Sequence, residues 1–152
     1  MAARTDNRVV IDAPEDLVWT MTNDVESWPE LFTEYAAAEV LDRDGDTVRF
    51  RLTTRPDESG RSWSWVSERT PDPETRTVRA RRLEPGPLLR YMNITWEYRE
   101  VPGGVEMRWV QEFETNPAAA LTDTRAVEFL NQHTAAEMAH IKQLVERAAG
   151  RV

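Results

Sequence analysis

Hydrophobic and polar residues alternate along six stretches in the middle of the chain, near 37–43, 46–55, 62–70, 75–84, 91–100 and 104–114. Alternate side chains of a β-strand share a face, so each stretch predicts a strand with one buried side. Turn-forming residues separate the stretches, among them DGD at 44–46 and PGG at 102–104. Short strands joined by tight turns indicate an antiparallel meander.

The two ends of the chain carry different patterns. A further strand is predicted at about 4–12, then a helix at about 14–22 that Pro14 can open, and a short helix at about 25–35. The segment 121–149 predicts one long helix, because mostly apolar residues, with Thr134 among them, recur at steps of three and four: Val127, Leu130, Thr134, Met138, Ile141 and Val145. We expect one α+β domain over residues 1–152, with a seven-stranded antiparallel sheet curved around the long helix and an interior space between them.

The stretch RSWSWVSER at 61–69 places an arginine in line with two tryptophans, because Trp63, Trp65 and Arg69 share one face of a strand. A buried aromatic side chain removes about 150–250 Å² from water, so the tryptophans belong inside. An unpaired charge in a dry core costs several kcal/mol, and the predicted inner face offers no acid. Arg69 is therefore predicted to line a pocket and meet an oxyanion or carbonyl there. The alternative is that it reaches water beside the turn at Pro71.

Other polar residues on the predicted inner faces are open to two interpretations. Arg82 continues the inward line of its strand, but the run RARR at 79–82 is also typical of a solvated edge. Gln111 and Tyr35, the latter ending WPELFTEY, also fit ordinary buried hydrogen bonding.

Composition excludes several kinds of chemistry. The net charge of −8 argues against nucleic acid or an anionic membrane as the main partner, and the absence of cysteine excludes disulfides and thiolate sites. No apolar run approaches the length of a membrane span, so we expect a cytoplasmic protein. His133 and His140 lack the spacing of a helical metal pair, and no nucleotide-binding or nucleophile motif is present. We therefore expect no metal and no cofactor, and catalysis by arginine, tyrosine, amides, hydroxyls or water.

Several blocks of the chain resemble the aromatase/cyclases of bacterial type II polyketide synthesis, of the tetracenomycin and spore-pigment types. They are TNDVESWPELFTEY at 22–35, TRPDESGRSWSWVSER at 54–69, YMN at 91–93 and GGVEMRWVQEF at 103–113. The resemblance covers roughly residues 1–145, and it implies the helix-grip fold of the Bet v1/START superfamily. That fold agrees with the order of elements expected from the patterns.

The resemblance also implies an activity. Such enzymes take a poly-β-ketone held on an acyl carrier protein, close its first ring, typically by a C9–C14 aldol condensation, and aromatise it. It implies catalytic roles for Arg69 and Tyr35. Positions resembling pocket-lining ones, together with Arg82 from the strand alternation, give the predicted substrate contacts: Trp28, Phe32, Thr33, Trp63, Trp65, Arg82, Met92, Asn93, Trp96 and Gln111. Thr33 stands where a serine is common.

Two other classes of protein would use the same fold without turnover. One is a carrier of lipids or other hydrophobic ligands, and the other is a binder of quinones or hormones. The combination of Arg69 and Tyr35 with the WxWVSxR block favours the cyclase. The expected partner is then the acyl carrier protein with its tethered chain, with a ketosynthase and chain-length factor as further candidates.

Overall fold

The computed structural model describes residues 3–150, and its elements follow the order expected from the sequence. The strands are β1 (Ala3–Ile11), β2 (Tyr35–Asp44), β3 (Thr47–Thr54), β4 (Ser64–Asp72), β5 (Thr77–Glu84), β6 (Leu89–Val101) and β7 (Gly104–Thr115). The helices are α1 (Glu15–Asn23), the 3₁₀ turn η1 (Val25–Ser27), α2 (Trp28–Leu31) and α3 (Asp123–Ala148). The second predicted helix is shorter than expected, because Phe32 already has an extended backbone and the chain enters β2 at Tyr35.

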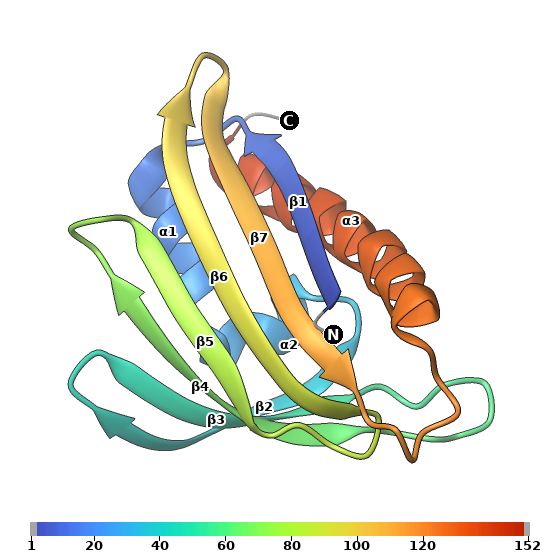
Figure 1. Ribbon diagram of the computed structural model, residues 1–152. Coiled ribbons are helices and arrows are strands. Elements are labelled where there is room, and N and C mark those ends of the chain that lie inside the picture. The colour runs from blue at the N-terminus through green and yellow to red at the C-terminus, as the bar shows by residue number, and fades with distance from the viewer. Residues whose placement is uncertain (1–2, 151–152) are drawn as a thin grey trace.

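All seven strands belong to one antiparallel sheet with the order β1-β7-β6-β5-β4-β3-β2. Strands β2 to β7 follow one another as a meander, and β1 pairs with β7 from Ala3 opposite Phe113 to Ile11 opposite Val105. The sheet stays open, with β1 and β2 as its edges. Figure 1 shows the strands curving around the side on which the helices lie, with α3 running beside β1.

The strand alternation predicted the buried face well. Inward residues such as Phe50, Trp96 and Met107 are almost fully buried and pack with Ile141 of α3. Val66 departs from the pattern, because it alternates with the inward Trp65 and yet is buried. The register between β4 and β5 shifts beside it, but the extra residue is Leu83 of β5, and β4 itself keeps an unbroken register with β3.

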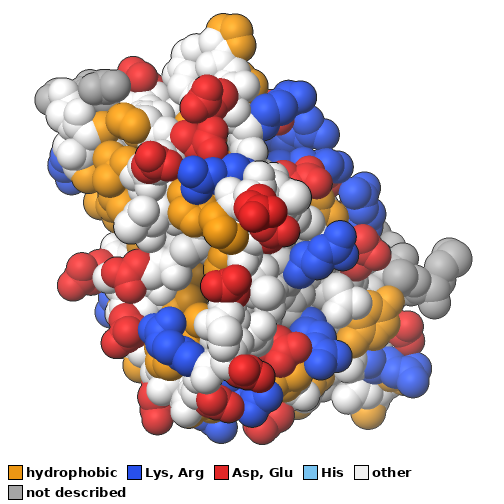
Figure 2. All heavy atoms as spheres, turned by 90° about the vertical axis from the view of Figure 1, so that its left-hand side faces the viewer, with side chains coloured by type: hydrophobic (Ala, Val, Ile, Leu, Met, Phe, Trp, Pro, Cys, Tyr) orange, Lys and Arg blue, Asp and Glu red, His pale blue; other side chains and the backbone are white. Residues whose placement is uncertain are grey.

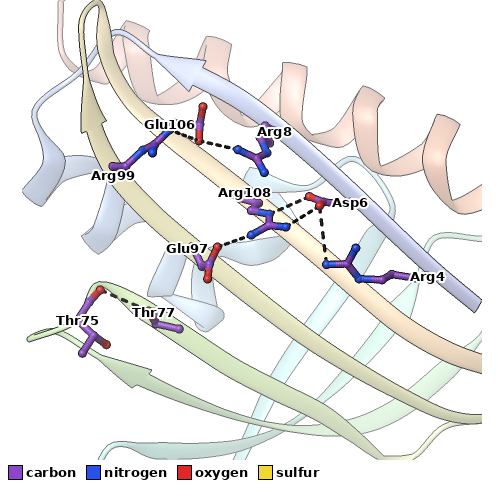
Figure 3. A network of polar contacts seen from close by, with 9 residues as sticks. All are labelled: Arg4, Asp6, Arg8, Thr75, Thr77, Glu97, Arg99, Glu106 and Arg108. Carbon is purple, nitrogen blue, oxygen red and sulfur yellow. Dashed lines mark hydrogen bonds and ion pairs between the residues drawn. The ribbon is translucent and has the colours of Figure 1, made fainter. Parts of the chain in front are cut away.

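The outer face of β1, β7 and β6 carries paired charges (Figure 3). Arg108 binds both carboxylate oxygens of Asp6 at 2.6 and 2.9 Å and Glu97 at 2.8 Å. The arginine holds the pKa of Asp6 below its ordinary value. Figure 2 shows acidic and basic side chains interspersed over a different face. Many arginines of this acidic chain therefore pair with its own carboxylates. Within residues 3–150, no helix combines the length and apolar character needed to cross a bilayer.

Candidate active site in an aromatic cavity

A cavity of about 280 Å³ lies between the concave face of the sheet and α3. Its walls come from α2, from β2 to β7, from the loop at 85–88 and from the first half of α3. At one end the lining is exposed, with Phe129 at 65 % and Leu88 at 39 %, whereas Arg69 and Trp96 are each only 2 % exposed. The cavity therefore has an open mouth beside α3 and a closed end at Arg69.

Arg69 is held at the closed end by the last turn of α1. Its Nε and Nη2 donate to Oδ1 of Asn23 at 3.1 and 2.9 Å, and Nη2 also reaches the carbonyl of Thr22 at 3.5 Å. The amide of Asn23 is itself fixed, since its Nδ2 donates to the carbonyl of Trp19 at 2.9 Å. Asn23 therefore presents its oxygen to the guanidinium, and the donors on Nη1 are used by neither Asn23 nor Thr22.

Two indole rings complete the surroundings of Arg69. The guanidinium carbon lies 5.1 Å from the ring centre of Trp28 and 4.4 Å from that of Trp96, within cation–π range. Burial lowers the pKa of Arg69, while the neighbouring Tyr98 opposes the shift, and an arginine still keeps its proton. Among residues 3–150 no carboxylate forms an ion pair with it. The structure thus holds a buried cation on a cavity wall, as predicted, and not a side chain that reaches water.

Tyr35 lines the same cavity as a neutral phenol. Its ring stacks on Trp28 at 6.2 Å with an interplanar angle of 14°, and it meets Trp65 edge-on at 6.0 Å. Burial raises the pKa of Tyr35 well above its ordinary value, and the adjacent Glu34 adds to the shift. The hydroxyl therefore stays protonated and can donate a hydrogen bond to a ligand oxygen.

Arg82 and Gln111 are both turned inward. The guanidinium carbon of Arg82 lies 4.0 Å from the ring centre of Trp65, and its buried Nε has no hydrogen-bond partner within residues 3–150. Arg82 is thus not a solvated edge residue. Oε1 of Gln111 accepts from the hydroxyls of Thr5 at 2.9 Å and Thr134 at 3.0 Å. Because both bonds use the oxygen, they leave the amide nitrogen of Gln111 to donate elsewhere.

The structure brings most of the predicted site residues to the cavity. Those that line it are Trp28, Phe32, Tyr35, Trp63, Trp65, Arg69, Arg82, Trp96 and Gln111. Met92, Thr33 and Asn93 do not. Met92 is buried in a separate cluster with Leu89 and Phe113.

Thr33 and Asn93 also lie outside the cavity lining, each for a different structural reason. Thr33 is exposed, and both its N–H, at 2.9 Å, and its hydroxyl bind the carboxylate of Glu137, so it ties α2 to α3. Asn93 is exposed on the outer face, because its neighbours Met92 and Ile94 occupy the inner one.

Several lining residues were missed by the sequence analysis. The first half of α3 contributes Phe129, His133 and Thr134, and the chain before β2 contributes Glu34. Nε2 of His133 lies 2.9 Å from Oε2 of Glu34. Thr134 was visible as a polar residue within the apolar stripe of α3, and that interruption was the available signal. No comparable signal marked Glu34 or His133.

A curved antiparallel sheet that grips a long C-terminal helix around an interior cavity is the helix-grip fold. The chain belongs to the family described as polyketide cyclase / dehydrase and lipid transport, whose model matches residues 11–140. This confirms the family expected from the sequence.

Individual proteins extend the comparison. A candidate polyketide cyclase of Streptomyces cyaneus is 52% identical over 98% of this chain and 97% of its own length. The actinorhodin polyketide synthase bifunctional cyclase/dehydratase of Streptomyces coelicolor is 33% identical over 89% of this chain, which spans 42% of that protein. The crystal structure of the ZhuI aromatase/cyclase from Streptomyces sp. R1128 superimposes with a TM-score of 0.81, covering 99% of this chain and 95% of that one at 24% identity.

Proposed function

We propose that this chain is a polyketide cyclase/aromatase of type II polyketide biosynthesis that closes and aromatises the first ring of a poly-β-ketone. Its family and the cyclase relatives support the general activity. One observation carries the finer assignment. The fully buried Arg69 and the neutral phenol of Tyr35 line the same aromatic cavity, and Arg69 has no carboxylate partner among the described residues. A site of this kind suits a neutral, oxygen-rich chain that develops negative charge on an oxygen as it reacts.

The reaction depends more on selecting the reacting carbons than on a strong base. A methylene between two ketones is already acidic, so the enzyme must choose one methylene and one carbonyl and hold them in contact. In the proposed mechanism Arg69 stabilises the enolate or alkoxide oxygen, and Tyr35 donates a hydrogen bond to the electrophilic carbonyl. One such donor is typically worth about 10²–10³ in rate. The rings of Trp28, Trp65 and Trp96 line the cavity and fold the chain for a C9–C14 closure.

We further propose that the substrate arrives on an acyl carrier protein, delivered from a ketosynthase and chain-length factor. Carrier proteins are acidic, so arginines near the mouth are the expected contacts. Arg61 is exposed over Trp63, a lining residue, at 5.7 Å, and the exposed Arg90 pairs with Glu114 at 3.0 Å. Arg55 suits this role less, because it already donates to the carbonyls of Thr33 and Pro29.

Reconstitution tests the proposed function. A minimal type II polyketide synthase is run with and without the protein, and the products are identified. We expect the protein to convert the spontaneous shunt mixture into a product with a single first-ring closure. Unchanged products, together with tight binding of a free hydrophobic ligand, would instead identify a carrier. Carrier docking should weaken as salt rises, and a flat salt response would exclude docking through arginines.

A further inference from the structure

Ring closure and aromatisation both move protons, so the cavity needs a group that can exchange them near neutral pH. The titratable residues in its lining are Glu34, Tyr35, Arg69, Arg82 and His133. Arginines keep their protons throughout the working range. Burial raises the pKa of Tyr35 well above its ordinary value. Glu34 and His133 are the lining residues that remain, and they contact each other.

Their geometry resembles an oriented acid–base pair. Nε2 of His133, on α3, lies 2.9 Å from Oε2 of Glu34, which precedes β2, and the two side chains are 27 % and 25 % exposed. The imidazole stacks on Phe129 with 5.8 Å between ring centres and an interplanar angle of 3°. Because Nε2 faces the carboxylate, Nδ1 is left to meet a ligand. Nε2 makes no hydrogen bond of full geometry within residues 3–150, so this contact acts as an ion pair that orients the ring by charge.

The surroundings favour a protonated imidazole. Glu34 raises the pKa of His133 above its ordinary value, Glu137 on the same helix adds to this, and burial opposes it. The other titratable groups in the lining are Arg69 on β4, Arg82 on β5 and the neutral Tyr35 on β2, which also interacts with Glu34. The stacked Phe129 is 65 % exposed, so the pair lies toward the mouth, where it can recover protons from water.

We propose that His133, oriented by Glu34, is the acid–base residue of the dehydration that follows ring closure, a role that rests on the proposed function. The closed ring carries a hydroxyl one carbon away from a ketone-activated C–H. Imidazolium Nδ1–H protonates the hydroxyl, the C–O bond breaks and water leaves. The electrons of the adjacent C–H bond form the new C=C bond, and its proton returns to Nδ1. One water is lost, and no oxidant or reductant is required.

Two variants with a matched control test this role. In the reconstituted system, His133→Gln should slow aromatisation about 10²-fold, at the lower end of what a general acid–base group contributes. The first carbon–carbon bond should still form at the correct position, so a product heavier by one water accumulates. His140→Gln alters the other histidine, on the same helix but outside the cavity lining, and should aromatise at the wild-type rate.

Glu34→Gln separates orientation from charge. The amide keeps the size of the carboxylate and its contact with Nε2, but it no longer stabilises the imidazolium. The high-pH limb of the aromatisation rate should therefore move to lower pH, which a merely structural role would not produce. NMR titration of the two histidines in the free protein should show the same downward move in the His133 midpoint, independently of turnover.

The outcomes separate the two proposals. A wild-type protein that leaves the shunt mixture unchanged overturns the proposed function, and this role with it. An active wild type whose His133→Gln variant aromatises at the wild-type rate overturns only the role of His133. If His133→Gln does not fold, the Glu34→Gln profile decides, and an unmoved limb refutes the pair.

Discussion

Replacing Arg69 by methionine should damage catalysis far more than stability. Methionine keeps an unbranched stem but lacks the guanidinium group and its charge. The loss includes the charged hydrogen bonding to Asn23, about 1.5–3 kcal/mol, and two cation–π contacts of about 0.5–2 kcal/mol each. Against this stands the cost of burying an unpaired cation, which is several kcal/mol. These effects oppose each other, so we expect the free energy of unfolding to change by less than about 2 kcal/mol.

The assay pairs denaturant unfolding, followed by tryptophan fluorescence, with product analysis in the reconstituted system. Arg69→Met should stay folded while first-ring selectivity is lost and the shunt mixture returns. Arg76→Met is the matched control, because Arg76 also lies over a tryptophan, Trp19, at 5.0 Å but pairs with Glu15 at 2.7 Å outside the cavity. Its products should not change. A loss of more than about 4 kcal/mol in Arg69→Met, or an unaltered product, would show that Arg69 is structural.

Three further predictions follow from the cavity and its neighbours. Trp65→Ala should cost less than the roughly 3–5 kcal/mol typical of a solid core and should yield misdirected aldol products, whereas Phe113→Ala, 0 % exposed and outside the cavity lining, should fall within that range. Equal losses in denaturant unfolding with unaltered products would place Trp65 in ordinary core. Because the pKa of His133 is raised, its pair with Glu34 should contribute fully to stability below the ordinary value of about 6.5, and this contribution should fade as pH rises through the folded value. A Glu34→Gln variant that keeps the same pH dependence of unfolding would contradict this. Exhaustive chelation should leave cyclisation intact, since residues 3–150 hold no cluster of three potential metal ligands, and activity restored by added zinc would refute the metal-free mechanism.

The alternation along the strands predicted the part of the site that lies on the sheet. Side chains two residues apart on one strand must share a face, so Trp65 could not point inward without Arg69 doing the same. The same rule already placed Asn93 outward, between Met92 and Ile94, and the resemblance to pocket positions pointed the other way. For Asn93 the local geometry was the better guide.

The part of the site built by α3 could not be predicted in this way. Periodicity identifies the apolar stripe of a helix, but it does not fix where along the sheet each turn of that helix lies. The contact between Glu34 and His133 depends on that placement, and so does the bond of Thr33 to Glu137, 104 positions further along the chain. Such pairings arise from the packing of whole elements, which no short stretch of sequence encodes.

The pairing of the first strand with the last has a consequence for how the protein is made. The hydroxyl of Thr5 on β1 binds Gln111 on β7, 106 positions away, and β1 has no neighbour in the sheet other than β7. During synthesis the earliest strand must therefore wait, unpaired, until nearly the whole sheet has left the ribosome. The meander from β2 to β7 can form meanwhile, but its aromatic face stays uncovered until α3 follows. Long-range closure of this kind slows folding and leaves apolar surface exposed to other chains. Truncation before α3 should accordingly yield an aggregating chain in place of an open but folded cavity.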